Sequence, residues 1–470
     1  EGAFSSYLRG TDGRRLKQKI AKGQWKPISD NNEVEPKDGY DVISTIDVNI
    51  QDIAHHALLK QLEYFEADHG TVVVMETKTG EIKAMSNLGR TETGTYFEKR
   101  NYAVYESHEP GSTFKLMAMT AALEDGVIDT SSVIDTENGV VRYYGRPVRD
   151  SRHGGYGKIS AAKAFEVSSN TAFTKIITEG YKDNPAKFVD KLYDMGLNSK
   201  IGLDIKGEGS PRIPHPKDKN WNGLSLPWMA FGYGVSITPL QTLNFYNAIA
   251  NNGEMVKPRF IKEVKEWDKS ILKVEREVMN PRICSPETAK KLQKMMQQTV
   301  EKGTAANIYT PNFSMAGKTG TCQVEYWIEP GRYISSFAGY FPAEDPKYSC
   351  IVIIHKPKRS KGYYGNIVAA PVFKQIAQKI YTDTPVMDTL PSLDIQNDKV
   401  TDDFDAYFAK IDNEKIVMPD VTGMPAMDAV SLLENLGLKV NFNGTGKVNG
   451  QSITAGQKIK TNQQVNLNIG

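Results

Sequence analysis

At 470 residues the chain is too long for one compact core, because a single domain commonly holds about 100 to 200 residues, so two or more domains are expected. Hydrophobic residues make up 39% and charged residues 24%, and no apolar run approaches the ~18 residues that cross a bilayer, which excludes a disordered or membrane-embedded chain. The 58 basic side chains nearly balance the 56 acidic ones, and a net charge of +2 gives no general attraction to nucleic acid, so no nucleic-acid partner is expected.

The cysteines and histidines show no disulfide or metal-binding pattern. Cys284, Cys322 and Cys350 are an odd number without CxxC spacing, and the seven histidines form no HExxH motif. We therefore expect no disulfide scaffold, no metal and no cofactor. Cys322 directly follows Thr321 in a predicted strand, where side chains alternate, so it should pack on the opposite face.

The N-terminal residues 1–27 are polar and punctuated by glycine, with no apolar face of their own. From Asp41 the alternating pattern VISTID predicts a strand, and the segment after it predicts a helix that lies on a sheet. The apolar residues of this helix follow the 3.6-residue period: Ile50, Ile53, Ala54, Ala57, Leu58, Leu62 and Phe65.

The order of the remaining elements indicates one mixed domain. Residues 71–77 and 81–87 predict an antiparallel hairpin around Gly80, and helical periods dominate from about 112 to 252. Thr238, Pro239 and Gln241 form a capping box that starts one of these helices. Strands return at 312–324, 333–341 and 348–355. We therefore predict one α+β domain over residues 41–381, whose sheet is completed by the returning chain.

The composition changes after a predicted helix at 371–381. Residues 382–415 contain nine acidic side chains and three lysines, which predicts a solvated acidic linker. Residues 416–470 contain a short amphipathic helix that ends at Gly437 and two alternating strands. They predict a small βαββ module with no cluster of reactive side chains.

The sharpest local motif is EPGSTFK at residues 109–115, which opens an apolar helical stretch. Ser112 would lie at a helix N-terminus, where unpaired amides and the helix dipole favour negative charge on its oxygen. Lys115, three residues later, lies on the same face. A lysine kept from water can be neutral, accept the hydroxyl proton and create a nucleophile. The competing interpretation is an ordinary capping serine beside a surface lysine.

Two further groups favour the catalytic interpretation. The triplet Ser168-Ser169-Asn170 places a hydroxyl and an amide in a segment otherwise suited to burial, although alone it would fit a helix cap. Lys318, Thr319, Gly320 and Thr321 lie on a predicted strand, where glycines allow a substrate backbone to pair alongside. Alone, they would fit a solvent-facing edge strand. An SxxK, SxN and KTG series in this order is the signature set of serine acyl-transfer enzymes.

With these motifs the chain resembles the class B penicillin-binding proteins, the monofunctional D,D-transpeptidases of peptidoglycan synthesis, over about residues 41–381. The resemblance rests on EPGSTFK, FGYGVSITPLQ, AGKTGT and YISSFAGYFP, and residues 416–470 resemble a PASTA domain. It implies the penicillin-binding transpeptidase and serine β-lactamase-like fold, an antiparallel five-stranded sheet flanked by helices. The triplet reads SSN rather than SDN, which fits transpeptidases better than class A β-lactamases.

The same resemblance implies a role for each motif residue. Ser112 would attack the substrate carbonyl, and Lys115 would be the base. Ser168 would relay a proton to the leaving amine, while Asn170 would bind the substrate amide. Lys318 and Thr319 would hold the substrate carboxylate, with Gly320 leaving room beside them. The backbone amides of Ser112 and Thr321 would form the oxyanion hole.

The resemblance also implies a cellular setting. Residues 1–40 would be the remnant of a pedestal or dimerisation region that follows a single membrane anchor, with the catalytic domain on the outer side of the cytoplasmic membrane. The implied partners are peptidoglycan stem peptides, β-lactam antibiotics, a membrane glycosyltransferase and division proteins. A C-terminal PASTA domain is typical of division (septal) or sporulation enzymes more than of elongation enzymes.

Three alternatives stay open from the residues. A serine β-lactamase shares the acylation chemistry, but no deacylation carboxylate is identifiable. A non-catalytic β-lactam or cell-wall sensor would be acylated only to signal. A D,D-carboxypeptidase differs only in using water as the acceptor.

Overall fold

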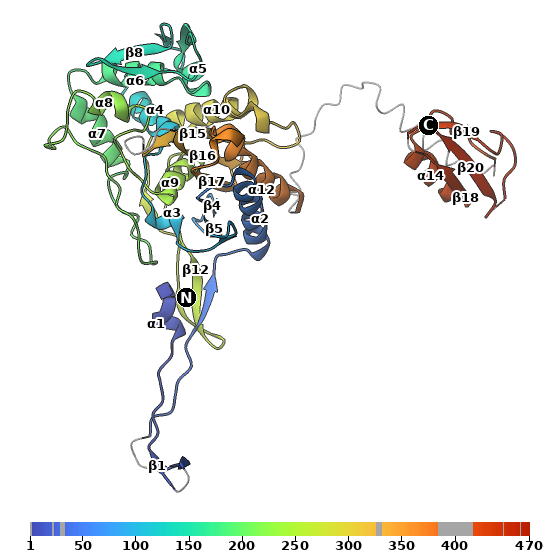
Figure 1. Ribbon diagram of the computed structural model, residues 1–470, viewed down its shortest axis with the longest axis horizontal. Helices are drawn as coiled ribbons and strands as arrows, with labels where there is room; N and C mark the ends of the chain where they lie inside the picture. Colours follow the sequence, from blue (N-terminus) through green and yellow to red (C-terminus); the bar gives the residue numbers. More distant parts are fainter. Residues whose placement is uncertain are drawn as a thin grey trace. The chain divides into compact units, whose positions relative to one another are not determined.

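The computed structural model describes residues 2–20, 23–28, 33–325, 331–383, 417–444, 446–460 and 462–470 (Figure 1). The chain divides into a larger unit, residues 1–385, and a smaller unit, residues 386–470. The acidic linker predicted at 382–415 lies, from residue 384 onward, outside the described residues.

A six-stranded antiparallel sheet is the centre of the larger unit. Its strand order is β15, β16, β17, β4, β5, β6, so the late strands join the early hairpin through the β17–β4 pair. The strands are β15 (Ala316–Val324), β16 (Arg332–Phe341), β17 (Tyr348–His355), β4 (His69–Glu76), β5 (Ile82–Arg90) and β6 (Tyr96–Phe97). The five long strands are the predicted sheet, and the two-residue β6 extends it at one edge. This confirms the α+β class and the completion of the sheet by the returning chain.

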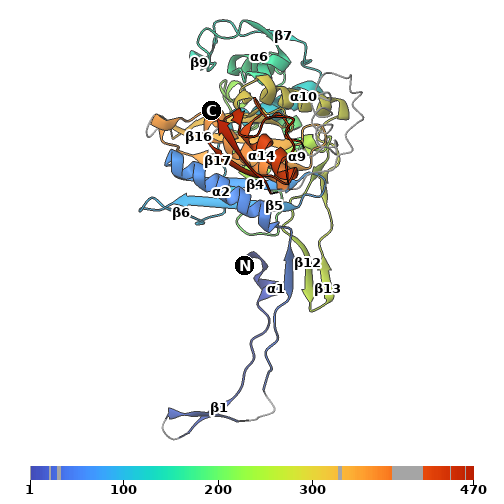
Figure 2. The ribbon, with the colours of Figure 1, turned by 90° about the vertical axis from the view of Figure 1, so that its right-hand side faces the viewer.

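Helices cover both faces of this sheet. Alternate residues of β4 point to opposite sides: Val72 and Val74 belong to one apolar core, and Val73 and Met75 to the other. Helices α2 (Val48–Phe65) and α12 (Ala370–Asp383) pack in the first core, and Figure 2 shows α2 along the strands. The second core contains buried apolar residues of α4 (Lys115–Glu124) and α9 (Pro239–Ala250). The sheet is therefore the middle of three layers.

The remaining elements of the larger unit are short or lie around this core. The other helices are α1 (Ser5–Leu8), α3 (Tyr102–Tyr105), α5 (Ala161–Glu166), α6 (Asn170–Gly180), α7 (Pro185–Asp194), α8 (Ser225–Met229), α10 (Pro286–Lys302) and α11 (Gly365–Val368). The smaller sheets pair β1 (Lys17–Lys19) with β2 (Trp25–Pro27), β7 (Val133–Asp135) with β10 (Lys158–Ser160), β8 (Val140–Tyr143) with β9 (Arg146–Arg149), β11 (Met255–Val256) with β14 (Val278–Asn280), and β3 (Asp41–Ser44) with β12 (Ile261–Glu266) and β13 (Lys269–Lys273).

The helix signals found in the sequence have their expected physical form. Asp47 caps α2 by accepting hydrogen bonds from the amides of Asn49 and Ile50, and the predicted apolar residues of this helix are buried. The predicted capping box of α9 is present: Thr238 accepts from the amide of Gln241, whose side chain accepts from the amide of Thr238.

The N-terminal segment is largely exposed, as its polar composition indicates. Two isolated antiparallel bridges, Thr11 with Lys37 and Arg14 with Val34, bring the outgoing and returning chain together. Figures 1 and 2 both show them as a narrow arm that leaves the body of the larger unit.

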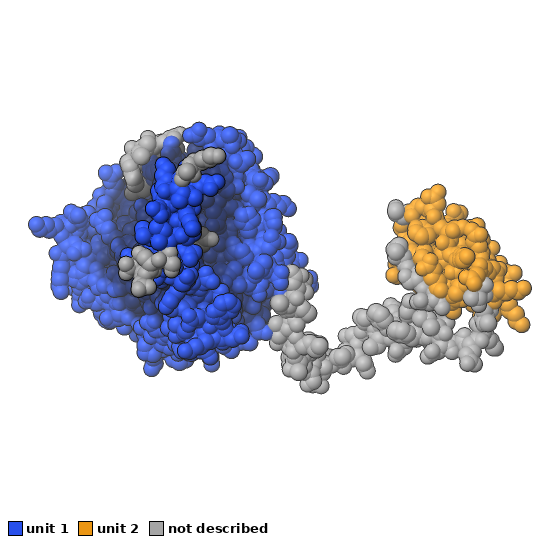
Figure 3. Space-filling model, turned by 90° about the horizontal axis from the view of Figure 1, so that it is seen from below, with its two compact units in different colours: residues 1–385 blue, residues 386–470 orange. Residues whose placement is uncertain are grey.

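The smaller unit, shown in orange in Figure 3, has its own apolar core beneath one helix. Helix α14 (Ala426–Asn435) precedes β18 (Lys439–Asn443), β19 (Val448–Gln451) and β20 (Gln464–Ile469), in the sheet order β18, β20, β19. The first strand of the expected βαββ module is reduced to a single bridge between Val417 and Lys458. The sequence did not indicate β19, because a strand that contains Gly450 is short and shows little alternation.

Candidate active site

Ser112 lies in a 3-10 helix, η3 (Gly111–Phe114), that leads directly into α4. Lys115 is the first residue of α4, so the predicted helix begins three residues after Ser112. In a 3-10 helix the side chains at positions i and i+3 eclipse, so the SxxK spacing still places both side chains on one side. The local geometry differs from the prediction, and no hydrogen bond joins the Ser112 hydroxyl to Lys115 Nζ among the described residues, because the amine bonds Ser168 and Asn170 instead.

Backbone contacts hold the η3 turn in place. The Tyr246 hydroxyl, from the buried helix α9, donates to the carbonyl of Thr113 over 2.9 Å. The Gly111 amide donates to the carbonyl of Gly232 over 3.1 Å. A Cβ atom on Gly232 would lie 2.1 Å from the Gly111 carbonyl oxygen, so the two backbones can approach this closely only with glycine at that position.

The Lys115 ammonium is fully buried and faces the SSN loop. Its Nζ donates to the Ser168 carbonyl at 2.7 Å, the Ser168 hydroxyl at 3.1 Å and Asn170 Oδ1 at 2.7 Å. Burial lowers the pKa of Lys115 to about 7, and the charge of Asp150 opposes this shift. Within the described part of the chain, the Ser112 hydroxyl has no hydrogen-bond partner, so it is free to receive a substrate.

The SSN triplet connects two helices, α5 and α6. Ser169 caps α6 by accepting from the amide of Ala172, and Ser168 just before it has a left-handed φ of 57°. Asp150 fixes this loop, because its carboxylate accepts from the Ser169 hydroxyl and from both the amide and the hydroxyl of Thr171. The left-handed backbone is thus held by contacts on the following residues.

Lys318 approaches the same hydroxyl from the edge strand β15. It is fully buried, and its Nζ donates to Ser168 Oγ at 2.8 Å and to the Thr319 carbonyl at 3.1 Å. Desolvation lowers its pKa well below the usual value, and the nearby charge of Lys115 adds to the shift. Ser168 Oγ is therefore shared by two buried amines from α4 and β15.

The close approach of β15 to the η3 turn depends on Gly320. A Cβ atom there would lie 2.2 Å from Ser336 Oγ and 2.9 Å from Thr113 Cγ2. On either side of it, the Thr319 hydroxyl bonds that of Thr304 at 2.7 Å, and Thr321 Oγ1 accepts from the Gly365 amide at 3.0 Å. Gly320 thus leaves the space in which the strand and the nucleophile turn meet.

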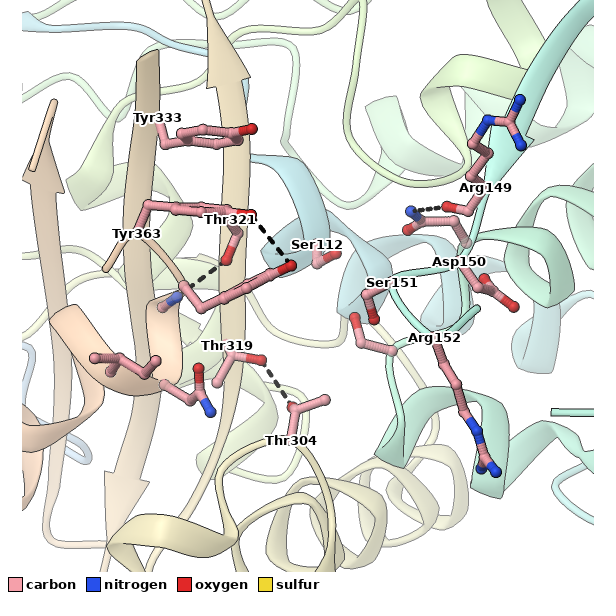
Figure 4. A pocket seen from close by; sticks show the side chains of 16 residues that line it. Ser112, Arg149, Asp150, Ser151, Arg152, Thr304, Thr319, Thr321, Tyr333 and Tyr363 are labelled. Atoms are coloured by element: carbon pink, nitrogen blue, oxygen red, sulfur yellow. Dashed lines mark hydrogen bonds between the residues drawn. The ribbon is translucent and has the colours of Figure 1, made fainter. Parts of the chain in front are cut away.

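These residues surround a pocket of about 700 Å³ (Figure 4). In Figure 4, Ser112 lies between β15, with Thr319 and Thr321, and the segment that carries Arg149 and Asp150. The pocket is lined by Ser112, Arg149, Asp150, Ser151, Arg152, Ser168, Asn170, Thr304, Thr319, Thr321, Tyr333, Tyr363, Tyr364, Gly365, Asn366 and Ile367. The structure brings the three predicted motifs together at one pocket.

The sequence did not indicate several residues of this site. Asp150 and Thr304 contact the motifs but belong to no recognisable spacing pattern. Tyr333 and Tyr363 stack with ring centroids 4.1 Å apart, although they lie on different elements. Cys322 is buried beside the site, and burial raises the pKa of its thiol, so it packs in the interior rather than facing the pocket.

Residues 70–378 match the family described as "Penicillin binding protein transpeptidase domain", and residues 416–470 match the family described as "PASTA domain". In Bacillus subtilis, "Stage V sporulation protein D" is 29% identical over 457 residues, 95% of this chain and 68% of that protein. "Penicillin-binding protein PbpB" of Mycolicibacterium smegmatis is 30% identical, over 80% of this chain and 60% of its own length. "Peptidoglycan D,D-transpeptidase FtsI" of Buchnera aphidicola is 29% identical, over 82% of this chain and 65% of its own length. The chain thus spans 60 to 68% of the length of these relatives.

Solved structures show the same fold. The apo crystal structure of penicillin-binding protein 3 from Mycobacterium tuberculosis aligns with a TM-score of 0.68 at 28% identity, over 82% of this chain and 84% of that chain. Penicillin-binding protein 2X from Streptococcus thermophilus, at 22% identity, aligns with a TM-score of 0.68 over 100% of this chain and 69% of that chain.

Among the described residues, no helix has the length and apolar character that crossing a membrane requires. Because the match to the transpeptidase family covers more than half of the chain, this protein belongs to the penicillin-binding protein transpeptidase domain family.

Proposed function

We propose that this protein is a serine D,D-transpeptidase that cross-links peptidoglycan stem peptides through an acyl-enzyme at Ser112. One observation carries the proposal: the buried amines of Lys115 and Lys318 share the Ser168 hydroxyl at the wall of the pocket that Ser112 lines. Burial favours the neutral form of Lys115 near neutral pH, which a base for the serine proton requires.

In the acylation step, Ser112 Oγ attacks the carbonyl carbon of the penultimate D-Ala, and Lys115 takes the hydroxyl proton. A C–O bond forms as the peptide C–N bond breaks. Ser168 passes a proton from the lysine to the leaving amine, since Lys115 Nζ lies 3.1 Å from its oxygen. The terminal D-Ala then leaves with its amine protonated, and the acyl group stays on Ser112. Asn170, bonded to Lys115, holds the base, and it would bind the substrate amide by exchanging the hydrogen bond that its side-chain nitrogen now donates to the Arg149 carbonyl.

The substrate is proposed to lie along β15, which is an edge strand of the sheet. Lys318 and the Thr319 hydroxyl would bind the terminal carboxylate of the substrate or of a β-lactam. Gly320 leaves room for the η3 turn rather than for the substrate, because a Cβ atom there would meet Ser336 and Thr113. The amides of Ser112 and Thr321 would donate to the developing oxyanion. An amine from a second stem peptide then attacks the ester, which restores the Ser112 hydroxyl.

The cellular assignment rests on the relatives. Proteins named for sporulation and for peptidoglycan D,D-transpeptidation cover most of this chain, so we assign the protein to cell-wall synthesis of the septal or sporulation type. We assign it to the cytoplasmic membrane, held there by an N-terminal anchor, with the catalytic domain on the outer side. A membrane glycosyltransferase and division proteins are its proposed partners. The proposed domains are a pedestal remnant at 1–40, the catalytic domain at 41–381, an acidic linker at 382–415 and the PASTA domain at 416–470.

Intact-mass measurement after incubation with penicillin tests the nucleophile. A single penicilloyl adduct is expected, and Ser112→Ala should abolish it. Ser151→Ala, which removes another hydroxyl lining the same pocket, is the matched control and should keep the adduct. An adduct that survives Ser112→Ala contradicts the assignment.

Product analysis with a lipid-linked stem-peptide substrate tests the reaction class. Cross-linked dimers are expected, with release of D-Ala. Release of D-Ala without dimers would assign a carboxypeptidase, and rapid turnover of nitrocefin would assign a β-lactamase. Acylation with none of these products would assign a sensor.

A further inference from the structure

Thr304 lines the Ser112 pocket but belongs to none of the three motifs. It follows α10 after one residue, Gly303, and it shares the pocket with Ser168 and Thr319. The Thr304 hydroxyl oxygen is 2.7 Å from that of Thr319, and Figure 4 shows this hydrogen bond beside strand β15. A side chain from a separate segment of the chain thus contacts the KTG motif inside the pocket.

The backbone of Thr304 is fixed to the helix that precedes the SSN triplet. Its amide donates to the carbonyl of Glu166, the last residue of α5, over 3.1 Å. Gly303 allows this approach, because a Cβ atom there would lie 2.5 Å from the same carbonyl oxygen. On the other side, the Ala305 amide donates to the Thr299 carbonyl of α10 over 3.1 Å. The Thr304 hydroxyl is therefore held in place between α5 and β15.

Thr319 is held from two sides. Its side chain is buried, with 7% of the residue exposed, and its carbonyl accepts from Lys318 Nζ at 3.1 Å. Its hydroxyl contacts that of Thr304. A β-branched side chain has little freedom at χ1, whereas the hydroxyl proton rotates to suit its partners. What Thr304 can set at Thr319 is therefore the direction of the O–H bond.

The two hydroxyls together have one proton to give to a ligand. Each hydroxyl carries one proton, and one of these two protons lies between the oxygens. Within the described part of the chain, neither oxygen has another hydrogen-bond partner, so the second proton is free for a ligand in the pocket. When Thr304 donates to Thr319, the free proton is the one on Thr319. A ligand against Thr319 that only accepts hydrogen bonds favours this direction.

A carboxylate is the ligand that matches such a donor. All the polar atoms of an ionised carboxylate are acceptors, and hydrogen bonds to it are roughly twice as strong as those to a neutral group. A hydroxyl that accepts one hydrogen bond is polarised and donates a stronger one, so the bond from Thr304 strengthens the bond that Thr319 gives. The pair therefore favours a free carboxylate over an ester or amide at the same position.

We propose that Thr304 is a positioning residue that makes the site selective for a free carboxylate, because it donates to Thr319 and directs the Thr319 hydroxyl toward the substrate. The inference rests on the proposed function, in which Lys318 and Thr319 hold the terminal carboxylate of a stem peptide or a β-lactam. It adds to the motifs a residue that sets the specificity of the site. Thr304 takes no part in the bond-making steps at Ser112.

Acylation rates with a penicillin and with its methyl ester, which has no carboxylate, test the proposal in the full chain. Thr304→Val keeps the shape of the side chain and removes the hydroxyl. The rate with the acid should fall about 3- to 10-fold, the effect of one lost hydrogen bond, and the rate with the ester should stay within about twofold. Thr304→Ser keeps the hydroxyl and should keep the wild-type ratio of the two rates.

Thr310→Val is the matched control. It makes the same substitution in the same connection between α10 and β15, but Thr310 lines a different pocket. Both acylation rates should be unchanged in this variant. Thermal unfolding of every variant shows that the folded state is kept.

A double-mutant cycle separates positioning from a general structural role. Thr319→Val removes the hydroxyl that Thr304 directs, so adding Thr304→Val to it should change the rate with the acid by less than about twofold. The proposal is overturned if the two losses simply add, if Thr304→Val slows the acid and the ester equally or slows neither, or if Thr304→Ser behaves like Thr304→Val.

The same assay distinguishes this inference from the proposed function. A wild-type protein that forms no adduct at Ser112 overturns both. A wild-type protein that is acylated at Ser112 but reacts equally fast with the acid and the ester overturns the carboxylate selectivity alone. A preference for the acid that persists unchanged in Thr304→Val overturns only the role of Thr304.

Discussion

Lys115 and Lys318 place two buried amines around one serine hydroxyl, although no carboxylate hydrogen-bonds either amine among the described residues. Two full positive charges so close together and away from water would repel each other. Burial therefore lowers both pKa values. In the proposed mechanism, the binding of a substrate carboxylate beside Lys318 would favour its charged form and would leave Lys115 as the neutral base.

The pKa of Lys115 sets the pH dependence of acylation. Only the neutral amine accepts the Ser112 proton, so the acylation rate should rise as the pH rises through about 7 and level off above it. Below this pH the amine is protonated and the rate falls. The measurement is the rate of acylation by a fluorescent penicillin across this range. A rate that rises up to about pH 10 would indicate a lysine with an unshifted pKa and would contradict the role of Lys115.

A variant of Asp150 tests whether Lys115 is the base, because the charge of Asp150 affects the pKa of Lys115. The charge of Asp150 raises the Lys115 pKa, so Asp150→Asn should move the acid limb of the profile to lower pH. Asp129→Asn is the control, because Asp129 is also a carboxylate in a loop but pairs with Lys291 instead. An unchanged midpoint in Asp150→Asn would show that the limb belongs to another group.

Ser168 combines a shared hydroxyl with a left-handed backbone, and two substitutions separate these properties. Ser168→Ala and Ser168→Gly both remove the hydroxyl, so each should slow acylation by about 10²- to 10⁴-fold. Glycine adopts a φ of 57° without steric cost, so Ser168→Gly should be at least as stable as Ser168→Ala. Denaturant unfolding gives the stability and penicillin acylation gives the rate. A full rate in either variant would remove Ser168 from the mechanism.

For individual residues, the sequence indicated the candidate site residues that belong to motifs. It did not indicate the residues that hydrogen-bond to those motifs. The sequence indicated the residues that belong to the SxxK, SxN and KTG motifs, because each motif has a fixed residue type at a fixed spacing. These residues are Ser112, Lys115, Ser168 and Lys318. Asp150 could not be found, because its contacts with Ser169 and Thr171 depend on how one loop folds over another.

The candidate site depends on close packing of strand β15 against the η3 turn. Gly320 of β15 permits this packing because it has no side chain. Gly320→Ala should lower the free energy of unfolding by about 1–3 kcal/mol and slow acylation, because the added methyl would overlap Ser336 Oγ and Thr113 Cγ2. Thermal unfolding and penicillin acylation measure the two effects.

A second substitution tests whether the effect of Gly320→Ala comes from this contact. Adding Ser336→Ala removes the closer of the two overlaps, so the double variant should recover part of the lost stability. Strictly additive losses would show that the methyl group acts elsewhere.

The sequence predicted best those helices and strands whose apolar pattern extends over many residues or whose first residue is a clear helix cap. Helix α2 and strands β4 and β17 have enough residues for periodicity to be unambiguous. The 3-10 turn at Ser112 was predicted as part of a helix, because four residues carry no period that distinguishes it from α4. The two-residue strand β6 was missed for the same reason.

On the scale of the whole molecule, tertiary structure brings together groups that the sequence keeps apart. The pairing of β17 with β4 closes the sheet and also places His355 beside His69, a neighbourhood that no spacing rule within one helix or strand reveals. The PASTA match, by contrast, depends on a local pattern, and its residues form a separate core. This difference explains why the sequence indicated the PASTA domain but not the pairing of His69 with His355.

The separation of the two units leads to a prediction about the isolated catalytic unit. Among the described residues, those that line the Ser112 pocket all belong to the larger unit. A chain ending at residue 385 should therefore be acylated by penicillin at a rate within about twofold of the full chain. The thermal unfolding transition of the larger unit should also remain, because the smaller unit has its own core. Acylation kinetics and calorimetry of both chains make the comparison, with Ser112→Ala in the shorter chain as the blank. A loss of more than tenfold in the acylation rate would show that the smaller unit contributes to the site.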